Sequence, residues 1–345
     1  MNTLTTLRDH TTHNRIILWG WQLAQWHSQA QIDEAITIQA YKAAWVDVID
    51  CADIYTGVEE AIWRVRNSVW SLDFPRIHTK HVPDLNAIET NTVTPESTRL
   101  LIERSLCRLG AMKLDLVQFH HWDYTIDTYR TSIWTLLELQ DEWKIWAVWV
   151  TNCSVEFLSK LESELEFIPI TTQNQYNIID RRIEKSLIDF AMERDIGVYA
   201  YGSLMGWLIS DKYLGMPEPQ EPIENRSLRK YLQIIRDWGT WDMFQGMLEL
   251  LSIMAWRYSV TISDIAIHWT LSRRWINAVI LWARHPQHAS SLHRIFSFSL
   301  SENDMREIDS IYQQWSPIVW DVFDIERYET RHRDIMKFNL NDPKK

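Results

Sequence analysis

Short runs of β-branched and apolar residues alternate with longer amphipathic segments along almost the whole chain. Eight of the short runs are apolar on both faces, which is typical of parallel strands covered by helices. They predict strands at residues 15–18, 46–50, 76–80, 115–120, 147–151, 170–175, 197–201 and 278–281.

The segments between these runs carry helix signals. Residues 94–110 are the clearest case, because Thr94 can cap the helix, Pro95 suits its first position and Gly110 suits its end. Similar patterns predict helices at residues 131–141, 155–162, 182–194, 244–258 and 302–314.

Eight alternations of strand and helix predict an α/β protein built as one closed (β/α)8 TIM barrel rather than an open doubly wound sheet. No GxGxxG phosphate loop follows an early strand, as the open type would require. We expect a single domain over residues 1–345 with its core at about 15–326. The PEPQEP stretch predicts a long loop at about 208–243, and the carboxyl end predicts a charged tail.

Charge and composition limit the classes of molecule that the protein is expected to bind. Lys and Arg total 35 against 46 Asp and Glu, a net charge of −11, and no basic groove is evident, which argues against nucleic acid. No apolar run reaches 18 residues and the amino terminus lacks the apolar centre of a signal peptide, so we expect no membrane partner. With three scattered cysteines, the sequence indicates a cytoplasmic protein whose partner is a small molecule, and it gives no oligomeric state.

Ionisable residues end three consecutive predicted strands. Asp50 ends the second strand, Lys80 the third and His120 the fourth, while Tyr55 lies in the loop after Asp50. Because the carboxyl ends of barrel strands meet at one mouth, where active sites form, these side chains are expected to converge there.

Together these groups suggest one reaction. A Lys80 ammonium would stabilise the Tyr55 phenolate and make the phenol a better proton donor, Asp50 would hold that ammonium, and His120 would orient the substrate oxygen. The result would be protonation of a carbonyl oxygen while hydride reaches its carbon. The alternative is a metallohydrolase barrel using the neighbouring histidines, but a lysine at the ligand position repels a cation, so no metal is expected.

Several segments resemble the signature segments of the aldo-keto reductases, a (β/α)8-barrel family that uses NADPH. They are VIDCADIYTGVEEAI, the strand-ending Lys80, LDLVQFHHW and AVWVTNCS, and the likeness extends over about residues 15–326. The resemblance implies that Asp50, Tyr55, Lys80 and His120 are a catalytic tetrad. It also implies NADPH-dependent reduction of an aldehyde or ketone, or the reverse oxidation of an alcohol.

The resemblance further implies a cofactor site and a substrate pocket. Thr151, Asn152 and Gln173 would hold the nicotinamide carboxamide and Tyr201 would stack on its ring. The other residues expected to contact NADPH/NADP+ are Gly202, Ser203, Leu204, Arg284, as the ligand of the 2′-phosphate, and His288. Trp21, His121 and Trp122 are expected to line the substrate pocket. A catalytically weak, NADP(H)-binding regulatory barrel subunit remains the alternative function.

Tryptophan and glycine counts are abnormal. The chain has 20 Trp and 9 Gly, and glycine is therefore far below the usual 7%. Many Trp stand where the resembling family has glycine, and returning these positions to glycine would bring the glycine content close to that average. The clearest are Trp19, Trp45, Trp63, Trp143, Trp149, Trp207, Trp275, Trp282, Trp315 and Trp320, and further cases are Trp26, Trp70, Trp146, Trp238, Trp241 and Trp256.

The hypothesis for this anomaly is that the gene uses UGA as a glycine codon, and that its conceptual translation reads UGA as Trp. Overpacking at ten such sites would cost about 10–30 kcal/mol against a total stability of about 5–15 kcal/mol. A lineage of Trp-rich, inactivated barrels is the alternative.

Overall fold

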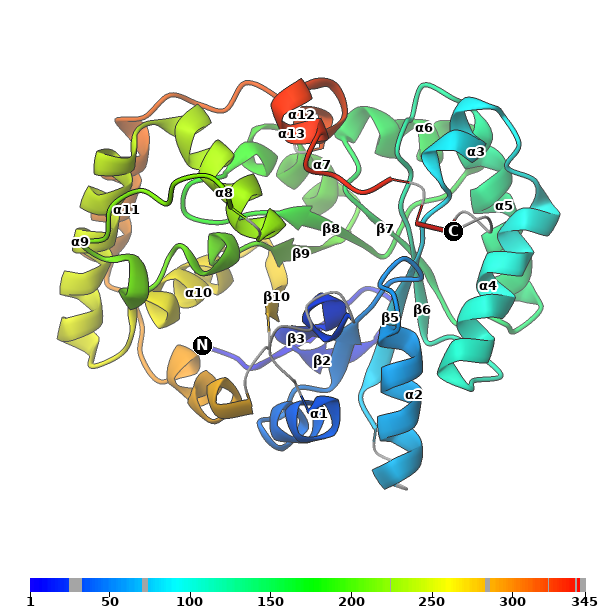
Figure 1. Ribbon diagram of the computed structural model, residues 1–345, viewed down its shortest axis with the longest axis horizontal. Helices are drawn as coiled ribbons and strands as arrows, with labels where there is room; N and C mark the ends of the chain where they lie inside the picture. The colour runs from blue at the N-terminus through cyan, green and yellow to red at the C-terminus, as the bar shows by residue number, and fades with distance from the viewer. Residues whose placement is uncertain are drawn as a thin grey trace.

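Eight parallel strands close into a barrel (Figure 1). The structure is a computed structural model that describes residues 1–24, 33–69, 74–223, 225–282, 286–321, 323–338 and 340–341. Around the barrel the strands run in the order β10-β3-β4-β5-β6-β7-β8-β9. The TIM-barrel fold class is confirmed, and each predicted strand lies within two residues of an observed one. Their bounds are β3 Ile16–Trp19, β4 Val48–Asp50, β5 Arg76–His81, β6 Leu116–Phe119, β7 Val148–Thr151, β8 Thr171–Gln175, β9 Gly197–Tyr201 and β10 Ile276–Trp282.

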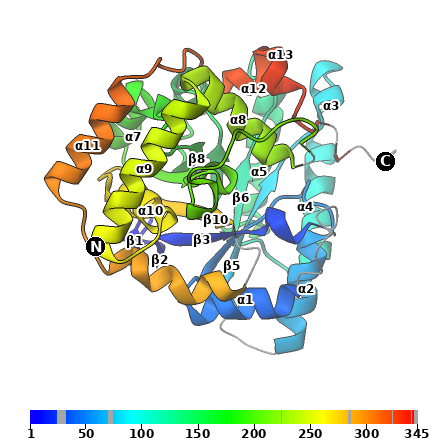
Figure 2. The same cartoon turned by 60° about the vertical axis from the view of Figure 1, so that its left-hand side comes forward.

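Helices surround the barrel, as the views in Figures 1 and 2 agree. The predicted capping of α4 (Pro95–Leu109) is confirmed, since Thr94 forms a capping box with Ser97 and Gly110 is left-handed at φ 56°. The other helices are α1 Glu34–Ala43, α2 Val58–Val69, α3 Leu85–Glu89, α5 Thr128–Asp141, α6 Val155–Leu165, α7 Leu187–Glu193, α9 Trp241–Tyr258, α10 Ile262–Ser272 and α11 Glu302–Gln313.

A hairpin that the sequence pattern did not predict closes the amino-terminal end of the barrel. Strands β1 (Leu4–Thr6) and β2 (Thr12–Asn14) pair antiparallel, and the buried Leu7 between them packs with Ile17 and Leu116 inside the barrel. Because this end is sealed, the cavities that can admit a substrate lie at the carboxyl mouth.

The sequence predicted one long loop at about residues 208–243, but the structure has a helix there. Helix α8 (Arg226–Trp238) begins at Asn225, whose side chain accepts a hydrogen bond from the Leu228 amide at 3.2 Å. One face of α8 is buried through residues that include Tyr231 and Ile235. The preceding proline-rich run and the charged first turn concealed this apolar face in the sequence.

The predicted charged tail also folds. Helices α12 (Asp324–Tyr328) and α13 (Thr330–Arg333) lie beside the carboxyl mouth, shown red in Figure 1. Over the described residues, no single helix is long and apolar enough to cross a membrane. The pair α9 and α10 passes such a test only jointly, with a bend of 92° between its members.

Two helices end on a tryptophan in the left-handed conformation. Trp45 follows α1 with φ 67° and Trp143 follows α5 with φ 64°. At each end the Trp amide donates to the carbonyl three residues back and the next amide donates five residues back, which is the Schellman pattern. Gly110 makes the same pair of bonds after α4. The backbone geometry at Trp45 and Trp143 is therefore the geometry that glycine adopts without strain.

We predict that Trp143→Gly stabilises the chain. A bulky residue at positive φ costs roughly 1–3 kcal/mol, and Lys113 keeps Trp146 as a cation–π partner at 4.2 Å when Trp143 is removed. The free energy of unfolding should rise by about 1 kcal/mol in urea titrations. The matched control is Trp134→Gly, at an exposed position inside α5, which should lower that free energy because glycine weakens a helix interior. Equal losses in both variants would contradict the prediction.

Candidate active site

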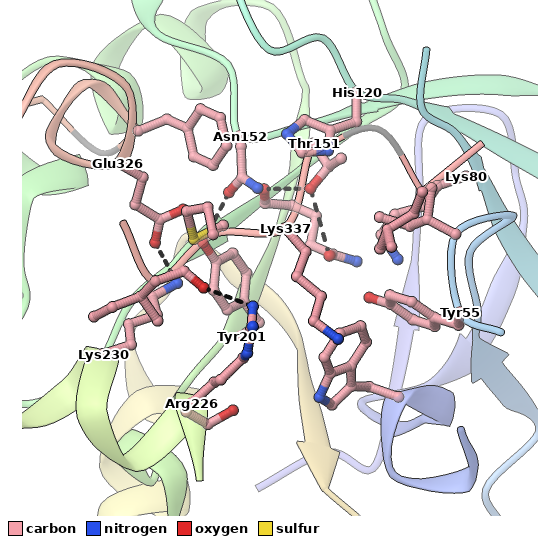
Figure 3. A pocket seen from close by; sticks show the side chains of 18 of the residues that line it. Tyr55, Lys80, His120, Thr151, Asn152, Tyr201, Arg226, Lys230, Glu326 and Lys337 are labelled. Atoms are coloured by element: carbon pink, nitrogen blue, oxygen red, sulfur yellow. Dashed lines mark hydrogen bonds and ion pairs between the residues drawn. The ribbon is translucent and has the colours of Figure 1, made fainter. Parts of the chain in front are cut away.

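A cavity of about 170 Å³ opens at the carboxyl mouth of the barrel. Its walls come from the ends of several strands, from the start of α8 and from the carboxyl-terminal segment (Figure 3). The residues that line it are Trp19, Trp21, Ile54, Tyr55, Lys80, His120, Trp122, Thr151, Asn152, Gln173, Tyr201, Arg226, Ser227, Lys230, Phe323, Glu326, Ile335, Met336, Lys337 and Leu340.

A buried ion pair lies at the base of this cavity. The Lys80 Nζ atom donates to both carboxylate oxygens of Asp50, at 2.7 and 2.6 Å, and to the Cys51 carbonyl at 2.8 Å. Both side chains are nearly inaccessible, at 6% and 1% of their surface. The pair forms because β4 and β5 are neighbouring parallel strands whose carboxyl ends meet at the mouth.

Two glutamines complete the surroundings of Asp50. Gln118 on β6 and Gln173 on β8 each donate from Nε2 to Asp50 Oδ1 at 2.8 Å, and Gln173 also donates to Gln118 at 3.0 Å. Sequence reasoning missed Gln118, and its signal was a polar residue inside an otherwise apolar strand. Gln173 was expected to hold the carboxamide of the cofactor, and in the structure its amide nitrogen binds Asp50.

Tyr55 lies beside this pair. The Lys80 Nζ is 5.4 Å from the centre of the Tyr55 ring, and the Tyr55 hydroxyl accepts a hydrogen bond from Trp19 Nε1 at 3.0 Å. Burial, and next the Asp50 charge, raise the pKa of Tyr55 above its ordinary value. The sequence argument expected the lysine charge to favour the phenolate, but that charge is offset by Asp50. The phenol is therefore held in its protonated form, which is the form a proton donor needs.

His120 supplies an uncharged imidazole to the same cavity. Burial lowers the pKa of His120 well below its ordinary value, and the nearby Arg327 and Lys80 charges add to this effect. Its Nε2 atom is buried and has no hydrogen-bond partner within the described parts of the chain. An unsatisfied buried polar atom at a cavity wall is suited to bind a polar ligand atom.

The residues expected to contact the cofactor divide between cavities. Thr151, Asn152 and Tyr201 line the first cavity, and the Tyr201 hydroxyl donates to Asn152 Oδ1 at 2.9 Å. Leu204 and His288 line a second cavity of about 490 Å³. Gly202 and Ser203 line a smaller space, of about 10 Å³, that Leu204 also borders. Arg284 lies outside the described residues.

Two of the three expected substrate-pocket residues are in place. Trp21 and Trp122 line the first cavity, and Trp21 packs edge-on against Tyr55 with ring centres 4.8 Å apart. His121 does not line it. Its side chain is fully buried elsewhere, with Nε2 3.0 Å from Thr128 Oγ1 at the start of α5. The expectation for His121 was wrong.

A group of charged residues in the wall was not predicted. Arg226 and Lys230 come from α8 and lie across from Tyr55 and Lys80 in Figure 3, while Lys337 comes from the carboxyl-terminal segment. Glu326 pairs with Lys230, and the Arg226 guanidinium donates to the Ile335 carbonyl at 3.1 Å. These positions were hidden because the sequence pattern assigned them to a loop and a tail.

The carboxyl-terminal segment is fixed over the mouth by Asn341. Its side-chain amide donates to Asp53 Oδ2 and to the Val82 carbonyl, both at 2.8 Å, and its backbone amide donates to Asp84 at 2.7 Å. Burial, together with the charge of Glu59, raises the pKa of Asp53 to about 8. Asp53 is thus a structural anchor for the segment that covers the cavity.

The described ranges contain no group of three His, Cys, Asp or Glu residues placed to hold a metal ion. The cavity does contain a phenol, an imidazole and the lysine of a buried ammonium–carboxylate pair, a combination suited to acid–base chemistry at the carboxyl mouth of a parallel barrel.

The sequence model of the Aldo/keto reductase family matches residues 15–313, and the chain belongs to that family. It is therefore an NAD(P)H-dependent oxidoreductase that acts on carbonyl or alcohol groups, and the resemblance found in the sequence is confirmed.

Relatives agree with this assignment. The chain is 25% identical over 309 residues to the aldo-keto reductase YhdN of Bacillus subtilis, covering 87% of this chain and 90% of the relative. It is 25% identical over 231 residues to an NADH-specific methylglyoxal reductase of Escherichia coli, covering 63% and 65%. Among solved structures, an aldo/keto reductase of Klebsiella pneumoniae in complex with NADP and acetate has a TM-score of 0.70 at 18% identity, covering 93% and 98%.

We predict that Asp53→Asn stabilises the protein more at high pH than at low pH. Because the folded-state pKa of Asp53 is raised from 3.8 to about 8, folding favours its protonated form, and this contribution is lost as the pH rises through that range. Asparagine keeps a neutral acceptor for Val82 and Asn341. Its gain in free energy of unfolding should therefore be larger at about pH 9 than at about pH 4.

Urea unfolding at the two pH values measures this difference. Asp141→Asn, the same change at the exposed end of α5, is the control and should show no such dependence on pH. A gain from Asp53→Asn that is the same at both pH values would refute the buried, protonated state of Asp53.

Proposed function

We propose that this chain reduces a small aldehyde or ketone with NADPH, with Tyr55 as the general acid, or catalyses the reverse oxidation. The observation that carries the proposal is one cavity wall that presents a protonated Tyr55 and the unpartnered His120 Nε2 beside the Lys80–Asp50 pair. The NADP and NADPH complexes of the Klebsiella aldo/keto reductases, which share the fold, support the choice of cofactor.

The residues around the first cavity fit a nicotinamide. Tyr201 offers an aromatic face, and Thr151 and Asn152 offer polar atoms next to it. In the second cavity, His288 and Lys212 offer groups that suit the phosphate-bearing half of a dinucleotide. When bound, the dihydronicotinamide supplies the hydride.

The remaining steps belong to side chains of this chain. His120 Nε2 orients the carbonyl oxygen, and the Tyr55 hydroxyl gives its proton to that oxygen as the carbon becomes saturated. The phenolate that remains lies beside the Lys80 ammonium, which stabilises the negative charge until a proton from solvent restores the phenol. Asp50 holds Lys80 in place through two short hydrogen bonds.

One observation favours the alternative, a weakly active NADP(H)-binding barrel. Trp19 donates to the Tyr55 oxygen and its ring centre is 6.3 Å from that of Tyr201, where the nicotinamide would stack. An indole bound to the Tyr55 oxygen would compete with a substrate carbonyl for that oxygen and so lower turnover.

The first prediction from this mechanism concerns Tyr55→Phe, which removes the proton donor and keeps the ring. The turnover number with NADPH and a panel of small aldehydes and ketones should fall by about 10²–10⁴-fold, while the dissociation constant of NADPH stays the same. Tyr129→Phe is the control, because that buried hydroxyl donates to Glu164 on the outer helices. Retained activity in Tyr55→Phe would remove Tyr55 from the mechanism.

A second prediction concerns the preference for binding NADPH over NADH. If Arg284 binds the 2′-phosphate, Arg284→Ala should raise the dissociation constant of NADPH by about 10–100-fold, the value of a charge-assisted hydrogen bond, and leave that of NADH unchanged. Calorimetric titration with both dinucleotides measures this, with the exposed Arg306→Ala as control. Equal weakening of the binding of both dinucleotides would show that Arg284 does not bind the 2′-phosphate.

A further inference from the structure

Three indoles stand between the two cavities that one dinucleotide would occupy. Trp19 lines the first cavity, while Trp282 and Trp207 line the second. The space that Trp207 and Trp282 border with Ser203 is only about 10 Å³, which is the least that a single bound water needs. The nicotinamide residues and the phosphate-side residues are therefore separated within one protein.

The barrel register places two of these indoles at one point. Trp19 and Trp282 are the last residues of neighbouring strands β3 and β10 and are paired directly, with ring centres 5.3 Å apart. Trp19 reaches from there to Tyr55 and Trp282 reaches into the second cavity. The contact between these two rings therefore joins a wall of the first cavity to a wall of the second.

The third indole is on a backbone that disfavours it. Trp207 has φ 73° and follows Gly206, which has φ 66°, in the turn after β9. An L-residue as bulky as Trp is strained at such φ, whereas glycine is not. Its ring is held against His288, with ring centres 5.1 Å apart, which is one of the residues expected to contact the cofactor.

Packing elsewhere in the chain shows the same conflict. The rings of Trp238 and Trp315 have centres only 2.9 Å apart, far inside the 4.5–7 Å of ordinary aromatic pairs, so the two indoles compete for one space. Trp149 is buried inside the barrel and its Nε1 has no hydrogen-bond partner among the described residues. Trp45 and Trp143 add strain at positive φ. At all these positions glycine, which has no side chain, would remove the conflict.

We propose that the functional chain carries glycine at positions 19, 207 and 282, and that the two cavities then form one continuous dinucleotide-binding cleft. The cofactor part of this inference rests on the proposed function. Glycine at position 19 also removes the donor that occupies the Tyr55 oxygen and uncovers the ring of Tyr201. A gene in which UGA encodes glycine accounts for all these positions together, with the low glycine count.

The identity of the residues is tested on the protein from its native host. Intact-mass measurement and peptide sequencing should find glycine at positions 19, 207 and 282, and the gene should carry UGA at these codons. Tryptophan in the peptides, or UGG in the gene, would overturn the inference. This result does not depend on catalysis, so a failure of the proposed function would appear separately, as absent turnover in glycine-bearing enzyme.

The cleft is tested with three recombinant chains. The first has tryptophan throughout, the second carries W19G, W207G and W282G, and the third carries W45G, W143G and W256G at exposed positions away from both cavities. In calorimetric titrations with NADPH, the second chain should bind at least about tenfold more tightly than the first, a difference of about 1.4 kcal/mol. The third should bind like the first.

Each outcome decides the proposal. Tighter binding confined to the second chain supports a cleft that the three indoles divide. Equal affinity of the first and second chains would overturn it, as would equal gains in the second and third chains, since the effect would then come from folding. Circular dichroism and the unfolding midpoint of each chain show whether the variants are folded, and the peptide result stands even if one is not.

Discussion

The ion pair between Lys80 and Asp50 holds the catalytic mouth of this barrel together. Two charges taken out of water are stable only when their remaining hydrogen-bonding capacity is met, and removal of one partner commonly costs about 3–5 kcal/mol. Here the lysine has three acceptors, and Asp50 also accepts from Gln118 and Gln173. The carboxylate thus links strands β4, β5, β6 and β8. The geometry of four strand ends depends on it, and so does the position of Tyr55 beside Lys80.

This arrangement also explains why Tyr55 and His120 are both uncharged. Burial is the largest cause that raises the pKa of Tyr55 and lowers that of His120. The Asp50 charge adds to the rise at Tyr55, and the Lys80 charge adds to the fall at His120. The site at rest holds a proton on the phenol and a free lone pair or N–H on the imidazole. In the proposed mechanism, stabilisation by Lys80 becomes effective only when a negative charge develops on the Tyr55 oxygen.

The barrel and much of its site were predictable because their signals are local. Each strand is a short apolar run, and parallel topology places Asp50, Lys80 and His120 at the same mouth whatever the details of packing. Gln118 and the orientation of His121 were missed because they depend on which side of a strand faces the cavity. The covering segment was missed for a different reason. Asn341 meets Asp53 from 288 residues away, and no periodic pattern reveals a contact between two polar residues so distant in sequence.

The tryptophan positions connect stability with function in one physical argument. The end of helix α5 and the turn after β9 at position 207 are unrelated parts of the fold, yet both place an indole on a left-handed backbone. Selection for activity would not explain the crowded Trp238–Trp315 pair or the surface tryptophan at position 143. Loss of activity would not by itself concentrate tryptophan at positions whose backbone requires glycine. A single change in decoding acts on every such codon regardless of its role. It would therefore account for strained caps, overlapping rings and two separated cavities in the same chain, while Asp50 and the side chains that bind it, Lys80, Gln118 and Gln173, include no tryptophan.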